Sequence, residues 1–189
     1  MRRWLDQLAA VADAIRVVRA NVVPAIEADT GIPFSRPDLV ILALFQPSTR
    51  NLFAEIGDHF RGTGACALSD ADLERLAGLS DAAAALAWIG DAALKIGVLR
   101  EIWNPDVRDA GLLTERRKRY ESNANMARLC DRWHLYEHRI RLENDTAAGE
   151  RDHLKGTLVE SVYAILFLEG GLARVAEAVH LLRPQGIGE

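Results

Sequence analysis

The sequence predicts an all-α protein. Alanine and leucine dominate the composition, whereas aromatic residues make up only 6%, and this bias favours helices over sheets. Apolar residues recur at helical spacing through most of the chain. No stretch alternates apolar and polar residues convincingly, as a half-buried strand would. Together these observations indicate a bundle of helices.

Size and charge limit the class of protein further. The chain has 189 residues, of which 49% are hydrophobic and 26% are charged, as in a soluble domain with a sizeable core. A net charge of −4 argues against a wholly basic surface and leaves room for a local basic face. Cys66 and Cys130 show no metal-binding spacing, so we expect reduced thiols in a cytoplasmic protein.

The N-terminus begins with Arg2 and Arg3 before an apolar run. Asp6 and Asp13 interrupt that run and no small-residue cleavage site follows, which indicates an amphipathic helix rather than a signal peptide. Because no run of about 18 apolar residues occurs, we expect no membrane-spanning segment.

The remaining elements follow from periodicity and from helix start and stop signals. Helices are expected at residues 3–28, 38–45, 80–103, 114–133, 151–168 and 172–182. We expect Pro24 to kink or end the first helix, and Ser80 or Asp81 to cap the helix 80–103. Between the helices we expect a polar break at 46–51, a loop with one short helix beginning near Ser69 in 52–79, and a surface connection at 134–149.

Two of these helices each carry one acid inside an apolar run. Asp91 lies within residues 84–99, and Glu160 lies within residues 155–172. A buried carboxylate is costly without a partner, and carboxylates that face each other across helices are how bundles build metal sites. Mg²⁺ prefers oxygen ligands and needs only one or two carboxylates. The alternative is a pair of acids hydrogen-bonded to backbone or arginine, in a fold retained for binding.

Other side chains near these acids are open to two interpretations. Thr157 lies one turn before Glu160 on the same side of its helix, where it can orient Glu160 or a metal-bound water or simply pack. Arg117, Arg128 and Arg132 can share a face that contacts phosphates, although a solvated helix surface is the commoner outcome for a run of charges. Trp88 is expected in the core.

Four blocks, in order, resemble the ribonuclease III family. The block AWIGDAAL at 87–94 resembles its signature helix, and LALFQPS at 42–48 resembles an early segment. The blocks at 111–123 and 159–171 are similar to two later helices. Two of the four acids usual in the family are absent, because Ala87 and Thr157 stand at those positions. Mini-ribonuclease III, a short and active branch, looks similar there.

This resemblance implies a ribonuclease III-like domain at 38–183, between an N-terminal helical extension at 1–37 and a tail at 184–189. It implies a homodimeric, Mg²⁺-dependent endonuclease (with Mn²⁺ as a substitute) that cleaves double-stranded or structured RNA and leaves a 5′-phosphate and a 3′-hydroxyl. Asp91 and Glu160 would hold the metal. The alternative is a catalytically inactive domain that serves as a dimeric RNA- or protein-binding module, favoured by Ala87, Thr157 and the net charge. A third interpretation discards the resemblance and leaves a helical interaction domain.

Overall fold

The protein is helical in the computed structural model, which describes residues 2–107, 109–142 and 148–184. Most of the predicted tail, residues 185–189, lies outside this range. The elements are α1 (Arg2–Val17), a π-helical turn η1 (Val18–Val22), α2 (Val23–Thr30), α3 (Asp38–Ala43), α4 (Ser48–Phe60), α5 (Asp70–Ala77), α6 (Leu79–Ile102), α7 (Ala110–Tyr120), α8 (Asn123–Arg132), α9 (Ala148–Ala178) and a 3₁₀ turn η2 (Val179–Leu182). The predicted all-α fold is confirmed, since the described residues form no strand beyond one isolated bridge.

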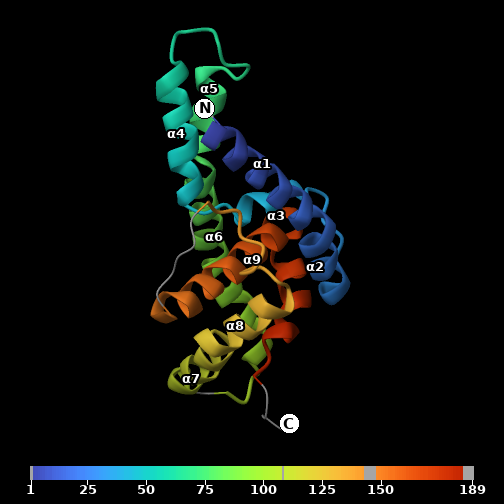
Figure 1. Cartoon of the computed structure of the whole chain (residues 1–189). Coiled ribbons are helices and arrows are strands. Elements are labelled where there is room, and N and C mark those ends of the chain that lie inside the picture. The colour runs from blue at the N-terminus through green and yellow to red at the C-terminus, as the bar shows by residue number, and fades with distance from the viewer. Residues whose placement is uncertain (1, 108, 143–147, 185–189) are drawn as a thin grey trace.

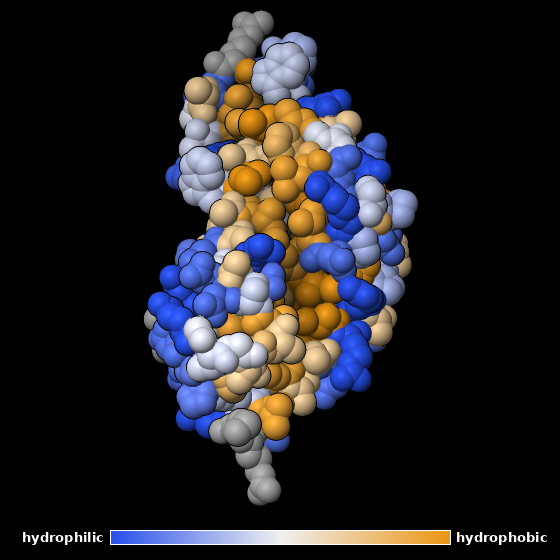
Figure 2. Space-filling view, turned by 90° about the horizontal axis from the view of Figure 1, so that it is seen from above, coloured by the Kyte–Doolittle hydropathy of each residue, from blue (hydrophilic) through white to orange (hydrophobic). Residues whose placement is uncertain are grey.

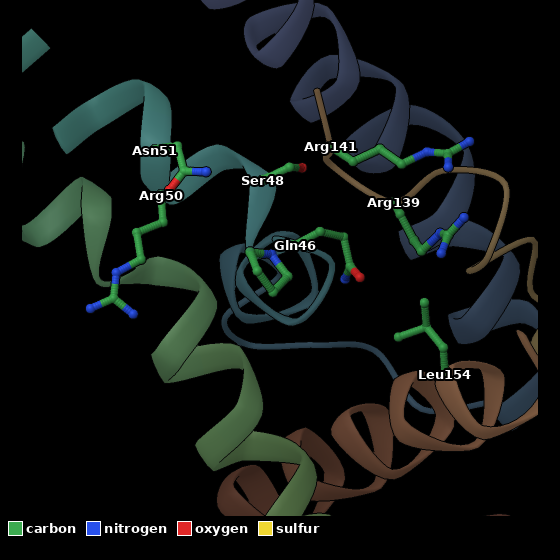
Figure 3. A pocket seen from close by; sticks show the side chains of 8 residues that line it. Gln46, Ser48, Arg50, Asn51, Arg139, Arg141 and Leu154 are labelled. Carbon is green, nitrogen blue, oxygen red and sulfur yellow. The ribbon is translucent and has the colours of Figure 1, made fainter. Parts of the chain in front are cut away.

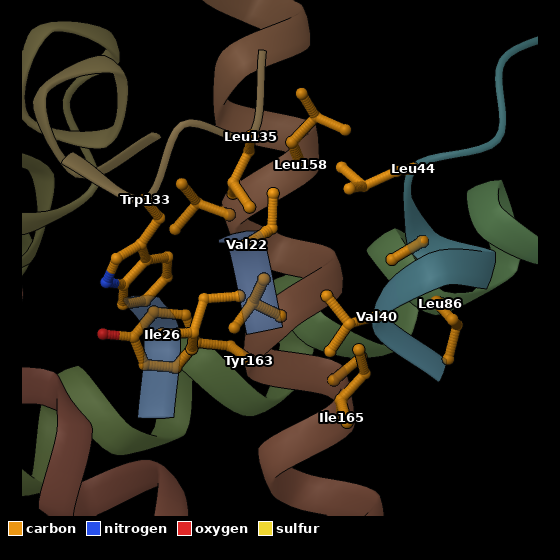
Figure 4. Close-up of a cluster of buried hydrophobic side chains, with 14 of the residues drawn as sticks. Val22, Ile26, Val40, Leu44, Leu86, Trp133, Leu135, Leu158, Tyr163 and Ile165 are labelled. Atoms are coloured by element: carbon orange, nitrogen blue, oxygen red, sulfur yellow. The ribbon is translucent and has the colours of Figure 1, made fainter. Parts of the chain in front are cut away.

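The core lies around α6 and α9, which pack along each other. Figure 1 shows α4 and α5 at one end of the molecule, and α7 and α8 at the other. Large buried side chains come from well-separated segments, as Figure 4 shows for Ile26 of α2, Trp133 after α8 and Tyr163 of α9. The Tyr163 hydroxyl donates a hydrogen bond to the carbonyl of Ala178, at 2.9 Å. Non-helical backbone at Gly170 and Gly171 turns the chain so that Ala178 can reach Tyr163.

The first helix does not end at Pro24. The chain passes through the π-helical turn Val18–Val22 and continues as α2 to Thr30. Proline lacks an N–H group and its ring crowds the preceding turn, and the widened turn η1 accommodates both effects. Gly31, in the left-handed conformation at φ 71°, ends α2.

The expected loop at 52–60 is wrong, and the polar break at 46–51 is shorter than predicted. Helix α4 already begins at Ser48 and runs to Phe60, because Leu52, Phe53 and Ile56 form one buried face. Three glycines interrupt the sequence of this region, yet Gly57 is helical, and only Gly62 and Gly64 take positive φ angles. The predicted helix start at Ser69 is confirmed, with a capping box between Ser69 and Asp72.

Three further predictions need correction. The helix expected at 114–133 is broken, because the side chain of Ser122 accepts a hydrogen bond from the amide of Asn125 and begins α8 as a new helix. The connection from residue 134 is only partly a surface segment, since Leu135 and Ile140 are fully buried. Helix α6 begins one or two residues earlier than predicted, at Leu79, and neither Ser80 nor Asp81 caps it.

Glu169 joins the N-terminal part of the chain to α9. Its carboxylate is almost fully buried and accepts hydrogen bonds from the amides of Ser35 (2.9 Å) and Arg36 (2.7 Å). Arg174 pairs with the same carboxylate at 3.4 Å. Val18, Val22 and Ile26 are also fully buried, so the segment before α3 completes the core. A domain boundary at residue 37 stays a prediction.

Among the described residues, α6 is the one helix long and apolar enough to cross a membrane, with a mean hydropathy of 1.6 over its most apolar window. The central helix of a soluble protein has the same length and composition. In this chain α6 packs against α9, and 44% of that window is buried inside the molecule.

Candidate metal centre

Gly90 allows α6 and α9 to approach each other closely. A Cβ atom built on Gly90 would lie 1.7 Å from the carbonyl oxygen of Glu160 and 3.0 Å from the amide nitrogen of Ala164. Only a residue without a side chain fits at this crossing. Because Asp91 follows Gly90 directly, the close approach brings Asp91 beside the turn of α9 that carries Glu160.

Asp91 already has a cationic partner in the protein. Lys95, one turn along α6, places its Nζ atom 2.6 Å from the Oδ2 atom of Asp91. Both side chains are about 40% exposed, so water reaches the pair and weakens it. The Lys95 ammonium group therefore lies where a metal cation bound to Asp91 would lie, and the two cations would compete for this carboxylate.

Glu160 lies in a half-buried position on α9. Burial raises the pKa of Glu160 above its usual value, and the negative charge of Asp91 raises it further, whereas His153 and Lys95 oppose the shift. The negative charge of Asp91 thus acts on Glu160 across the helix pair. A shared metal site at these two carboxylates stays a prediction.

Glu121 is a third acid at this site, and it was missed in the sequence. It follows α7, and Arg117 pairs with its Oε2 atom at 3.2 Å. The other oxygen, Oε1, is buried and has no hydrogen-bond partner among the described residues. Burial raises the pKa of Glu121, with Asp91 adding to the effect and Arg117 opposing it. In the sequence, Glu121 is a lone acid at a helix break. This break was not recognised, because one continuous helix was expected at 114–133.

Thr157 lies on α9 one turn before Glu160, as predicted. Its hydroxyl donates a hydrogen bond to the carbonyl of His153, at 3.2 Å, and its own carbonyl accepts one from the Ser161 hydroxyl, at 3.0 Å. The hydroxyl oxygen of Thr157 keeps lone pairs that can accept a further hydrogen bond. A role in orienting Glu160 stays a prediction.

The donor chemistry of this site suits a hard cation. Asp91, Glu160 and Glu121 offer only oxygen atoms, which Mg²⁺ and Mn²⁺ prefer, and the unpartnered Oε1 of Glu121 leaves one buried acceptor unsatisfied. Within the described part of the chain, no three acidic, histidine or cysteine side chains are arranged as a ready-made metal cage. The arrangement therefore fits an ion that is held by two carboxylates and keeps several waters.

The three arginines predicted to contact RNA lie on two helices. Arg117 is on α7 and pairs with Glu121. Arg128 and Arg132 are on α8, where Arg128 donates hydrogen bonds to Asn125 and to the carbonyl of Leu181, and Arg132 pairs with Asp29. Each guanidinium thus has a partner within the protein. RNA contact by these residues stays a prediction.

A row of apolar side chains on α6 faces solvent. Trp88, expected in the core, is 78% exposed, so that expectation is wrong. It shares a helix face with Ala92, Ile96 and Leu99, which are also exposed, and Trp103 continues the row just after the helix. Hydrophobic residues gather in a band on one face of the molecule, as Figure 2 shows. An exposed apolar row of this length is typical of an interaction surface.

The fold and the site together define a class of protein: an all-helical domain with a carboxylate pair where two core helices cross. Residues 84–171 match the family model of the ribonuclease III domain. The matched segment contains both Asp91 and Glu160. No curated protein and no solved structure matches the chain. The likeness to the Mini-ribonuclease III branch stays a prediction.

Proposed function

We propose that the protein is a divalent-metal-dependent endonuclease that cleaves double-stranded or structured RNA in RNA processing, in the cytoplasm. The observation that carries this proposal is the crossing at Gly90, which brings Asp91 beside Glu160 within a domain of a nuclease family. Phosphodiester hydrolysis needs an activated water and relief of the phosphate charge, both of which a bound Mg²⁺ supplies.

The protein's own groups would prepare this site. Asp91 and Glu160 would hold Mg²⁺ or Mn²⁺, and a proton competes with the metal for the Glu160 carboxylate, whose pKa is raised by burial. Lys95 must release the Oδ2 atom of Asp91, and the exposure of this pair keeps that exchange inexpensive. Metal affinity should therefore rise with pH, because binding and proton release are coupled.

Cleavage of long double-stranded RNA by the purified protein tests this proposal. The assay compares Mg²⁺ with EDTA, and the wild type with Asp91→Asn and Glu160→Gln. Calorimetric titration with Mg²⁺ measures metal binding separately from activity. Metal-dependent cleavage that both substitutions abolish, together with weakened Mg²⁺ binding, is the expected result. Cleavage that survives both substitutions would show that the catalytic site lies elsewhere.

One observation favours a second candidate, a catalytically inactive domain that binds RNA or protein as a dimer. The Lys95 ammonium pairs with Asp91, and Ala87 and Thr157 supply no further acids. A folded protein that binds the RNA but neither cleaves it nor takes up Mg²⁺ would support this candidate.

We further propose a homodimer that forms through the exposed apolar row on α6. Isologous dimers are the commonest oligomers, and Trp88, Ile96 and Trp103 would bury their surface against the same residues of a second copy. Sedimentation should give a dimer for the wild type and a monomer for Trp88→Glu and Ile96→Glu. Leu68→Glu is the control, because Leu68 is an exposed apolar residue that precedes α5 and is not part of α6. Dissociation by this variant as well, or a monomeric wild type, would contradict the proposal.

A further inference from the structure

A cavity of about 350 Å³ lies away from the metal centre, between the start of α4 and residues 139–141. Figure 3 shows Arg50 and Asn51 on its α4 side, Arg139 and Arg141 on the opposite side, and Gln46 and Ser48 between them. We call these six side chains the arginine pocket.

Backbone hydrogen bonds hold the two sides of the arginine pocket together. Ile140 forms the isolated bridge with Phe45, through bonds from the Gln46 amide to the Ile140 carbonyl (3.0 Å) and from the Ile140 amide to the Leu44 carbonyl (2.9 Å). The Leu142 amide donates to the Ser48 hydroxyl, at 3.1 Å. Because Arg139 and Arg141 flank Ile140, this short ladder fixes where both arginines enter the cavity.

Arg139 is held rigidly at the wall of the cavity. It is only 5% exposed, its Nε atom donates to the Tyr136 carbonyl at 2.8 Å, and its guanidinium lies 3.4 Å from the centre of the Tyr136 ring. A guanidinium stays charged even when it is buried, so its side chain is oriented in advance and loses little freedom on binding an anion. On the other side Arg50 is positioned by Asp81, at 3.1 Å.

The helix that borders the arginine pocket adds to its attraction for anions. Pro47 and Ser48, at the beginning of the 13-residue helix α4, line the cavity, and the amide end of a helix carries partial positive charge. The side chains of Gln46, Ser48 and Asn51 supply neutral hydrogen-bond donors around the guanidinium groups. Several convergent donors and a positive charge are the chemistry that recognises the oxygens of a phosphate.

We propose that the arginine pocket binds a phosphate group. Its volume lies at the small end of the range for ligand sites and accommodates a phosphate with part of the molecule that carries it. Leu154 of α9 borders the same cavity and precedes Glu160 by six residues, about 9 Å along a helix. The phosphate would thus bind without touching the metal centre. Because this proposal requires neither a metal nor cleavage, it can fail or hold independently of the nuclease.

Titration of the full-length protein with inorganic phosphate tests the proposal, with calorimetry and ³¹P nuclear magnetic resonance as readouts. Arg141→Ala and Arg50→Ala remove a guanidinium from opposite sides, and each should raise the dissociation constant about tenfold, the loss expected for one charge-assisted hydrogen bond. Arg75→Ala is the matched control, because Arg75 is an exposed arginine paired with Asp72 elsewhere. Thermal unfolding verifies that the variants fold.

A second arm of the experiment identifies the source of the phosphate. It compares one short RNA duplex with 5′-phosphate ends and with 5′-hydroxyl ends, in EDTA. A preference for the 5′-phosphate that Arg141→Ala removes would assign a terminal phosphate, whereas equal weakening for both duplexes would assign an internal one. Absence of phosphate binding by the wild type, or equal binding by wild type and both pocket variants, would overturn the proposal.

Discussion

The candidate metal centre and the arginine pocket carry opposite charges and are positioned by different means. At the metal centre two long helices cross so closely that only glycine fits at position 90, and the acids are carried by the crossing itself. At the arginine pocket two irregular segments are joined by a pair of backbone hydrogen bonds around Ile140. The first arrangement depends on core packing, and the second depends on a local ladder at the edge of the core.

This difference separates stability from binding. A change at the helix crossing disturbs the core and the acids together, whereas a change of an arginine leaves the core as it was. The net charge of −4 does not reveal these two sites, since the negative charges of the acids and the positive charges of the arginines cancel in the sum.

Gly90→Ala should have the largest effect, because its Cβ atom would overlap the backbone of Glu160. We expect a loss of roughly 3 kcal/mol in the free energy of unfolding, measured by urea denaturation. Gly156→Ala is the matched control on α9, where the new Cβ atom would lie 4.0 Å from that of Met126; this variant should be neutral or slightly stabilised. Equal stability of Gly90→Ala and the wild type would refute the close crossing.

Glu160 should make the stability of the metal-free protein fall as pH rises. Its pKa is higher in the folded protein than its ordinary value of 4.5, mainly because of burial. Below about pH 4.5 Glu160 is protonated in both the folded and the unfolded protein, so it costs no stability. As pH rises through the pKa of the folded protein, the folded state must bear a buried charge and the free energy of unfolding falls. Unfolding free energies from pH 4 to pH 7 should therefore decline less in Glu160→Gln.

Glu115→Gln provides a control of opposite sign for this pH series. The hydrogen bond and charge of Lys118 lower the pKa of Glu115, so its contribution is present above about pH 4.5 and is lost as pH falls. A steeper decline in Glu160→Gln than in the wild type would contradict the assignment of a buried, raised Glu160.

Lys95→Ala tests the metal centre without changing the arginine pocket. Removal of the ammonium group frees Asp91 and takes away a charge that repels cations, so Mg²⁺ should bind roughly threefold more tightly. Calorimetric titration with MgCl₂ measures this change. Lys118→Ala, which removes an exposed lysine from α7, should leave Mg²⁺ affinity unchanged; a fall in affinity in Lys95→Ala would mean that the lysine supports the metal instead of competing with it.

Arg50→Ala should have the smallest effect on folding. The Arg50–Asp81 pair is exposed on both sides, and such pairs contribute about 0.5 kcal/mol or less. Urea denaturation should therefore barely distinguish this variant from the wild type, even though its phosphate binding falls. A loss as large as that of Gly90→Ala would show that the arginine pocket belongs to the core after all.

The sequence predicted the helical class and the two acids because both depend on local pattern. Asp91 and Glu160 interrupt apolar runs, and such an interruption is visible in one dimension. Trp88 was placed wrongly because periodicity identifies an apolar face but does not say whether this chain or another copy covers it.

Contacts between distant segments could not be predicted. Glu121 reaches the metal centre only because Ser122 caps a new helix and redirects the chain. Arg139 and Arg141 lie in the stretch that was expected to be a surface connection, since nothing local indicates that Ile140 pairs with Phe45, which lies 95 residues earlier in the chain. Both features arise from tertiary structure.

The hydrogen bonds at Glu169 bear on how such a chain can be shortened or recombined. A fragment that began at Asp38 would leave this almost fully buried carboxylate without the amides of Ser35 and Arg36. It would also remove Asp29, which accepts the hydrogen bond donated by the indole N–H of Trp133. An exchange of the first helices between homologous chains would succeed only when the partners of Glu169 and Trp133 were exchanged with them, so these two contacts tie the N-terminal segment to α9 and to the end of α8.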